Sequence, residues 1–267
     1  MRGEPAATEK VLVYDGDCPI CIRGSERFVR WGLVPEERRR EFQSYDGEPA
    51  ERLAAAGFRN EMAVFEPASG EIRTGIPGFL WLLRDGRFGA LAQLFDRPFF
   101  LAPLTGVYHL VSYNRRILAP PRSAIRCACD PDDRPAYQLA LLVLLLAFAL
   151  GVGALFGAAV AAGSGMPPGQ GALWGLLATG AGWAALAVAA LIAVPAGVRL
   201  RFLAHLAVVA AIGAAVLLPA ALLAPFLRGA PLWLVVALAA GAALVVMARQ
   251  LPLRLRYLGL WPRRRPT

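Results

Sequence analysis

The chain has 267 residues, a hydrophobic fraction of 57% and a formal net charge of +9. This hydrophobic fraction exceeds the roughly 45–50% of ordinary soluble domains. Residues 1–138 hold 19 basic and 19 acidic residues, whereas residues 139–267 hold nine arginines and no acid. Because these arginines lie between and after apolar stretches, they indicate a membrane-topology signal rather than nucleic-acid binding. We therefore expect a lipid bilayer, and no nucleic acid, as a partner.

One stretch near the N-terminus reads VLVYDGDCPICIRGSERFVRW. A β-rich run, Val11 to Tyr14, precedes Asp-Gly-Asp, and Cys18-Pro19-Ile20-Cys21 then opens a helix that should run to about Trp31. The partial positive charge of a helix N-terminus favours a thiolate, which is the reactive form of cysteine. Proline is tolerated in the first turn because its missing N–H would be unpaired there. The arrangement predicts a redox-active dithiol in which Cys18 attacks and Cys21 resolves.

Two acids flank these thiols. Asp15 is a candidate to accept the proton of the resolving cysteine as a general base, although an acid so close also opposes thiolate formation. Asp17 fits better as the N-cap of the helix, where a short side-chain acceptor is favoured.

The string YDGDCPIC, with Asp15, Cys18 and Cys21, resembles the D-x-x-C-x-x-C signature of the DCC family of thiol-disulfide oxidoreductases. The resemblance continues to about Cys129 and includes an aromatic segment, Val107 to Arg116, and a trailing cysteine. It implies a thioredoxin-like α/β domain and thiol–disulfide exchange with a protein or small-molecule substrate. Asp15 occupies the signature position, so it ranks first for proton transfer. We expect no cofactor.

The first half is expected to comprise a flexible tail over residues 1–10 and a domain over residues 11–130. Next we expect a strand over Glu41–Tyr45 and a helix over Glu48–Ala56 that ends at Gly57. A hairpin of Met62–Glu66 and Glu71–Thr74 should follow. The last expected elements are a helix over Gly78–Arg84, which Pro77 opens, and a helical segment over Pro98–Tyr113. This order fits a thioredoxin. Thioredoxins carry a cis-proline before the first hairpin strand, but the loop Arg59-Asn60-Glu61 contains no proline, so we do not expect substrate docking along the usual proline edge.

Cys127 and Cys129 leave three alternatives open. They could relay electrons to the first pair, a hypothesis that the thiol-activating charges of Arg115, Arg116, Arg122 and Arg126 motivate. Together with Cys18 and Cys21 they could instead bind zinc as four thiolates, or they could be structural. Their C-x-C spacing is tighter than in most zinc sites, and the strand–DGDCPIC–helix context favours redox chemistry.

The second half predicts an all-α bundle of four transmembrane helices over residues 139–250, after a linker over 131–138. A span needs about 20 apolar residues to cross a hydrocarbon core of about 30 Å. The expected spans are residues 139–162, 172–194, 202–223 and 232–248, and a basic tail follows over 251–267. The positive-inside rule places the 195–201 loop and the tail in the cytoplasm. Four spans then place the N-terminal domain there too, in agreement with the absence of a visible signal peptide, and predict a multi-pass protein of the plasma (inner) membrane.

The spans are rich in Gly and Ala, and Gly153 and Gly157 have the G-x-x-x-G spacing that allows close helix contact. His205, at the start of the third span, is the ionisable candidate within these spans, and its position near the interface favours a packing role. The bundle is therefore expected to anchor the chain or to dock a membrane-protein partner. The alternative functions are a membrane scaffold whose cysteines bind zinc or are structural, and a transporter regulated by a redox domain.

Overall fold

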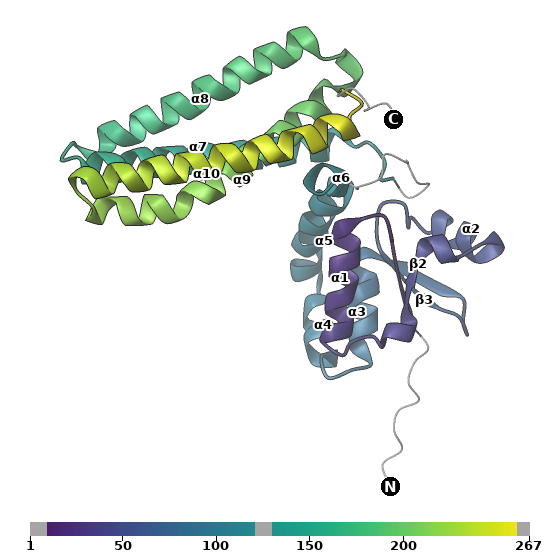
Figure 1. Ribbon diagram of the computed structural model, residues 1–267. Coiled ribbons are helices and arrows are strands. Elements are labelled where there is room, and N and C mark those ends of the chain that lie inside the picture. The colour runs from purple at the N-terminus through teal and green to yellow at the C-terminus, as the bar shows by residue number, and fades with distance from the viewer. Residues whose placement is uncertain (1–9, 121–129, 261–267) are drawn as a thin grey trace, which may run out of the picture. The chain divides into compact units, whose positions relative to one another are not determined.

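The computed structural model describes residues 10–120 and 130–260, which belong to two compact units, Met1–Tyr137 and Gln138–Thr267 (Figure 1). The first contains a small mixed sheet with helices, and the second consists of long apolar helices.

The described part of the first unit contains one sheet of four strands in the order β2-β1-β3-β4. The strands are β1 (Val11–Tyr14), β2 (Arg39–Glu41), β3 (Ala63–Glu66) and β4 (Glu71–Thr74). Strand β1 pairs parallel to β2 and antiparallel to β3, and β3 pairs antiparallel to β4. The first strand and the hairpin are confirmed.

The second strand lies earlier than predicted, and the prediction over Glu41–Tyr45 is wrong. Arg39 pairs in register with Leu12, and its guanidinium lies 4.2 Å over the ring of Tyr14. The residues after this edge strand form a turn of 3-10 helix, Phe42–Ser44, instead of extended chain. A strand made of three charged residues has no apolar alternation, so the period-2 signal for a strand is missing.

The helices of the first unit are α1 (Pro19–Arg30), α2 (Gly47–Ala55), α3 (Gly75–Arg84), α4 (Gly89–Phe95), α5 (Pro98–Tyr113) and α6 (Arg115–Leu118), and a 3-10 turn covers Glu36–Arg38. Helix α3 begins two residues before Pro77, because Gly75 adopts a φ of +59° and donates its N–H to the Met62 carbonyl at 2.9 Å. The short helices α4 and α6 were not predicted.

Alternate residues of β1 separate the core into two faces. Leu12 and Tyr14 pack with the cysteines of α1 and with Trp81 of α3. Val13 packs on the opposite face with Leu53 of α2 and with Phe58. In Figure 1, α1 and α3 accordingly lie on one side of the sheet and α2 on the other. The dithiol helix is therefore fixed against the centre of the sheet.

The helices of the second unit are α7 (Pro135–Gly163), α8 (Pro168–Ala193), α9 (Arg199–Leu223) and α10 (Gly229–Tyr257), and 3-10 turns cover Ala196–Val198 and Ala224–Phe226. In the described residues these four helices are long and apolar enough to cross a bilayer, which indicates a membrane protein. The expected spans are confirmed as helices. Helix α10 continues to Tyr257, so the expected tail begins as helix, since Leu and Arg are good helix formers beyond the apolar run. Helix α7 likewise begins inside the expected linker.

Small residues bring α7 and α8 together. A Cβ atom added at Gly157 would lie 2.2 Å from the Gly171 carbonyl oxygen, and one at Gly153 would lie 2.2 Å from the Thr179 hydroxyl oxygen. The G-x-x-x-G pair of α7 therefore forms the close contact that its spacing predicts. Helices α9 and α10 pack side by side (Figure 1), whereas α8 exposes large apolar side chains such as Trp174 and Ile192.

Candidate redox site

The two thiols lie where the loop after β1 enters α1, with Cys18 just before the helix and Cys21 in its first turn. Cys18 is the N-cap residue of α1; its N–H donates to the Asp15 carbonyl at 3.2 Å, and its own carbonyl accepts the Ile22 N–H at 3.0 Å. The prediction that Asp17 is the N-cap is wrong by one residue. The backbone N–H of Asp17 instead donates to the Asp15 carboxylate at 3.0 Å, so Asp15 organises the turn that precedes the helix.

The two thiols are free, buried and unequal in acidity. A hydrogen bond from the Cys21 thiol lowers the pKa of Cys18 from its ordinary value of 9.0 to about 7; burial opposes this change, and the Cys21 backbone N–H and the positive charge of Arg115 support it. The same hydrogen bond, together with burial, raises the pKa of Cys21 well above its ordinary value. Of the two thiols, Cys18 is therefore the one that ionises as the pH rises through about 7, and Cys21 is the proton donor of the pair.

Asp15 is 1% exposed and is surrounded by cations and donors. Arg116 donates Nη2–H to Asp15 Oδ2 at 3.0 Å, and Nη2 of Arg115 lies 3.7 Å from the same oxygen. The Gln43 amide donates to Asp15 Oδ1 at 3.1 Å. A buried carboxylate is tolerated when opposite charges and hydrogen-bond donors surround it. This geometry makes Asp15 an anchor between the dithiol loop and α6.

Arg116 connects three parts of the chain. Besides Asp15, its guanidinium donates Nη1–H to the Asp17 carbonyl at 3.1 Å, and Nε lies 3.0 Å from Oδ1 of Asp130. Arg116 is itself 4% exposed. Helix α6 is thus attached directly to the turn that carries Cys18, although it lies about 100 residues later in the chain.

Arg115 holds the loop before β3. Its guanidinium donates to the Arg59 carbonyl at 2.7 Å and to the Asn60 carbonyl at 3.1 Å, and the Ser112 hydroxyl donates to the same Asn60 carbonyl. At the end of this loop, the Met62 N–H donates to the Tyr108 hydroxyl at 2.9 Å. This is the loop that lacks the expected proline, and the described residues contain no cis peptide bond.

Met62 belongs to the same buried cluster as Cys18 and Cys21. The hydroxyl of Tyr108, which fixes the Met62 backbone, has its pKa raised by burial, so it stays a neutral phenol. The loop before β3 thus ends beside the dithiol, where it contributes the Met62 thioether, and residues of α5 and α6 hold it in place.

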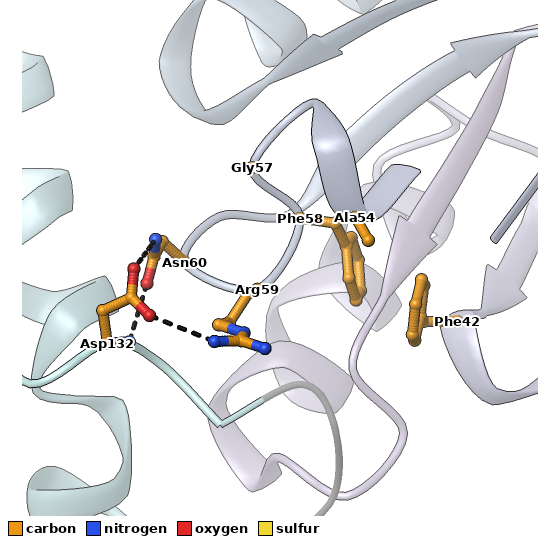
Figure 2. A pocket seen from close by; sticks show the side chains of 7 residues that line it. All are labelled: Phe42, Ala54, Gly57, Phe58, Arg59, Asn60 and Asp132. Atoms are coloured by element: carbon orange, nitrogen blue, oxygen red, sulfur yellow. Dashed lines mark hydrogen bonds and ion pairs between the residues drawn. The ribbon is translucent and has the colours of Figure 1, made fainter. Parts of the chain in front are cut away.

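Figure 2 shows an open pocket of about 380 Å³ on the same unit, lined by Phe42, Ala54, Gly57, Phe58, Arg59, Asn60 and Asp132. The Phe42 and Phe58 rings stack with centroids 4.3 Å apart. Asn60 donates its amide N–H to the Asp132 carboxylate at 2.9 Å and accepts the Asp132 backbone N–H at 2.9 Å. The hydrogen bond from the Asn60 amide, together with Arg59, lowers the pKa of Asp132. The polar groups of this pocket are thus engaged with one another, and neither cysteine of the dithiol lines it.

Several predicted residues lie elsewhere. Cys127 and Cys129, and with them the predicted relay and the four-thiolate zinc alternative, lie outside the described residues, as do Arg122 and Arg126. Within residues 10–120 and 130–260, no group of three or more metal-ligating side chains gathers. His109 pairs with Glu61, with Nε2 and Oε1 2.5 Å apart, and takes no part in the dithiol hydrogen bonds.

Sequence reasoning missed the attachment of Arg115 and Arg116 to Asp15 and assigned these charges to the later cysteines. The sequence does contain a signal for this contact. Asp15 directly follows a buried strand, and a buried carboxylate requires a cation nearby. Arg115 and Arg116, adjacent at the end of the aromatic segment, are candidates for that cation. Comparisons of the chain with models of protein families, with curated proteins and with solved structures find no match.

Proposed function

We propose that the chain is a membrane-anchored thiol-disulfide oxidoreductase whose first unit is a thioredoxin-like dithiol domain. The unequal acidity of Cys18 and Cys21 carries this proposal. Exchange requires one thiolate that attacks the substrate disulfide and a second thiol that stays protonated until it resolves the mixed disulfide. The strand order β2-β1-β3-β4, with the dithiol helix directly after β1, supports the thioredoxin-like assignment.

In the direction of substrate reduction, the Cys18 thiolate attacks one sulfur of a substrate disulfide. A mixed disulfide forms on Cys18, and the other substrate sulfur leaves as a thiolate. Cys21 then loses its proton and attacks the Cys18 sulfur, which releases the second substrate thiolate and leaves a Cys18–Cys21 disulfide. Two electrons pass to the substrate, and the reverse sequence oxidises a dithiol substrate. Protein or small-molecule disulfides are the proposed substrates.

Asp15 is the proposed acceptor of the Cys21 proton, and its contacts give it a second role. Its carboxylate accepts hydrogen bonds from Gln43 and Arg116, so replacing it also loosens the turn before α1. The two roles are separable: a proton-transfer role changes the pH dependence of the resolving step, whereas an anchoring role changes stability at every pH.

Access to the thiolate requires movement, because Cys18 has 0% exposed surface. An attacking sulfur must touch its target sulfur, so neighbouring groups have to open before exchange. Arg116 is the direct connection between α6 and the Asp17 carbonyl, and loss of this connection should expose Cys18 to reagents.

The direct test traps the mixed disulfide on the full chain in detergent, with Cys127 and Cys129 replaced by serine. In Cys21→Ser the resolving thiol is absent, so a glutathione disulfide probe should leave a stable adduct of one glutathione on Cys18. In Cys18→Ser the Cys21 thiol loses its hydrogen bond with Cys18, but burial still raises its pKa, so the adduct should form more slowly than on Cys18. Equal adduct formation in the two variants would contradict the assigned roles.

We further propose that four spans place both the first unit and the C-terminus in the cytoplasm of a cell with a plasma (inner) membrane. The supporting pattern is the arginine distribution, with two arginines in the 195–201 loop and six after residue 248. A reporter fused after Thr267 should read as cytoplasmic and one inserted near Pro168 as external. A cytoplasmic reading at both positions would remove this topology.

The complete burial of Cys18 favours one competing function, a membrane scaffold whose cysteines are structural or bind zinc. That role predicts one zinc per chain after purification without chelators, or thiols that never form a reversible disulfide. A metal-free protein that cycles between dithiol and disulfide would exclude it.

A further inference from the structure

Helix α5 of the first unit is uncharged along its whole length. Its 16 residues, Pro98–Tyr113, contain no Asp, Glu, Lys or Arg. The other surface helices of this unit do carry exposed charges, such as Arg23 and Arg27 on α1 and Glu51 on α2. A helix that faces water normally presents a polar side to it. Helix α5 therefore departs from the pattern of its own unit.

One side of α5 packs into the first unit and the other side is exposed. On the inner side, Tyr108 contacts Phe79 of α3 edge to face, with ring centroids 5.6 Å apart. On the outer side, Phe99 is 81% and Val107 is 64% exposed. Residues three, four, seven and eight apart share one side of a helix. We call the exposed residues of that side the apolar α5 face, which comprises Phe99, Ala102, Pro103, Gly106 and Val107.

Helix α4 adds to the exposed apolar surface beside α5. The two helices pack on each other, and α4 exposes the side chains of Leu91 and Leu94. Residues 86–114 contain a single acid, Asp96, which pairs with Arg84. A contiguous exposed apolar surface of this kind marks a site that binds a membrane or another protein.

The end of α5 is attached to the residue that leads into the first membrane helix. The rings of Tyr113 and Tyr137 stack with centroids 4.8 Å apart, and the Asn114 amide donates to the Tyr137 carbonyl at 2.9 Å. Tyr137 is the last residue of the first unit and precedes Leu139, where the apolar run of α7 begins, by two positions. Tyrosine is enriched at this level, the membrane–water interface.

This attachment keeps the apolar α5 face within reach of a bilayer. Phe99 precedes Tyr113 by 14 residues, which is about 21 Å along a helix at 1.5 Å per residue. Four helices among the described residues are long and apolar enough to cross a membrane, so the chain itself supplies that bilayer. A lipid surface is therefore the apolar partner that always lies near this face.

The length and the flanking charges of α5 indicate how it meets lipid. Sixteen residues are fewer than the roughly 20 that a span needs, and the inner side of α5 is occupied by α3. The helix therefore cannot cross the bilayer and fits a position in the interface plane. The exposed Arg97 begins α5 and the exposed Arg87 precedes α4. Basic side chains beside such a helix are attracted to anionic phospholipids.

We propose that the apolar α5 face docks the first unit on the surface of the bilayer that holds the membrane helices. Phe99 and Val107 enter the boundary between head groups and acyl chains, and Arg87 and Arg97 stay among the head groups. The occupant of the face is lipid rather than a second copy of the chain or a soluble protein. The docking does not depend on the redox activity of the first unit.

The test labels the full chain with lipid in nanodiscs that hold one chain each. The discs contain phosphatidylcholine and phosphatidylglycerol, and a part of the phosphatidylcholine carries a photoreactive diazirine in the upper part of one acyl chain. Mass spectrometry after illumination should find lipid adducts on α4, α5 and the membrane helices, and none on α2. Adducts confined to the membrane helices would overturn the proposal. Loss of the α5 adducts in discs that hold two chains would show a contact between copies and also overturn it.

The variants Phe99→Asp and Val107→Asp should each lower the yield of α5 adducts about tenfold, because a carboxylate is expelled from the apolar boundary. Both side chains are exposed, so neither change removes a core contact. Ala55→Asp is the matched control, because it places the same charge at an exposed position of α2, and it should keep the yield. The adduct yield on the membrane helices is the internal reference. An unchanged α5 yield in both α5 variants, or an equal loss in Ala55→Asp, would contradict the docking face.

Discussion

Each unit buries an arginine almost completely, and the two guanidinium groups meet different surroundings. In the first unit Arg116 contacts two carboxylates and a backbone carbonyl. In the second unit Arg254 contacts the ring of His205, and that half of the sequence contains no acid at all. The first unit thus pairs its buried guanidinium group with carboxylates of its own sequence, whereas residues 139–267 contain no Asp or Glu that could do the same.

The substitution expected to have the largest effect is Asp15→Ala, which removes a carboxylate that pairs with buried Arg116. This change leaves buried Arg116 with only one of its two carboxylates, Asp130, and removing one partner of a buried ion pair typically costs about 3–5 kcal/mol. Hydrogen exchange of the β1 and α1 amides in the full chain measures the loss. Asp46→Ala, at an exposed position, is the control and should cost under about 1 kcal/mol. Equal protection in both variants would show that Asp15 is not an anchor.

The packing of the second unit is tested by two glycines of α7. Gly157→Ala forces a Cβ against the Gly171 carbonyl, where overpacking typically costs about 1–3 kcal/mol, while an added Cβ at Gly151 meets nothing within 4 Å. Gly151→Ala should be neutral or stabilising, since alanine is the better helix former. Thermal unfolding in detergent compares the two, and matching midpoints would argue against close contact of α7 and α8.

The pKa of Cys18 tests how much a single buried charge, that of Arg115, contributes within the first unit. Because the pKa of Cys18 is lowered from 9.0 to about 7, its thiolate forms as the pH rises through about 7, and alkylation should reach half its maximal rate there. Folding therefore stabilises the thiolate, and this contribution is present above pH 9 and is lost as the pH falls through 7. Arg115→Gln removes a lowering charge, so its alkylation midpoint should lie between 7 and 9. An unchanged midpoint would remove Arg115 from the site.

The smallest effect is expected at the solvated face of α1. Arg30 and Glu26 form an exposed pair, with the nearest nitrogen and oxygen 3.9 Å apart. Such pairs contribute under about 0.5 kcal/mol and are screened by salt. Glu26→Gln should therefore leave the unfolding midpoint nearly unchanged, in contrast to Asp15→Ala. A large, salt-insensitive loss would show that charge burial is not what distinguishes these positions.

Local patterns predicted those elements whose residues alternate or repeat along the chain. Val11 to Tyr14, the hairpin and the long apolar helices carry such patterns, and the structure contains them. Strand β2 was misplaced because Arg39-Arg40-Glu41 has no apolar alternation. The four residues of α6 are too few to show a period.

The thiols and the acid beside them were predictable from C-x-x-C at a strand–helix junction. Their surroundings were not, because Asp15 and Arg116 lie far apart in the chain and local spacing does not encode their contact. The same applies to His205 and Arg254, which are brought together by the packing of α9 on α10. Sequence reasoning placed His205 near the interface but had no means to show its partner.

The most direct test of the central claim is a redox titration of Cys18 and Cys21 in the metal-free full chain, with Cys127 and Cys129 replaced by serine. We predict a reversible two-electron transition between roughly −270 and −120 mV, the range of thiol oxidoreductases. A pair that stays reduced across this range, together with stoichiometric zinc in the unmodified chain, would contradict it.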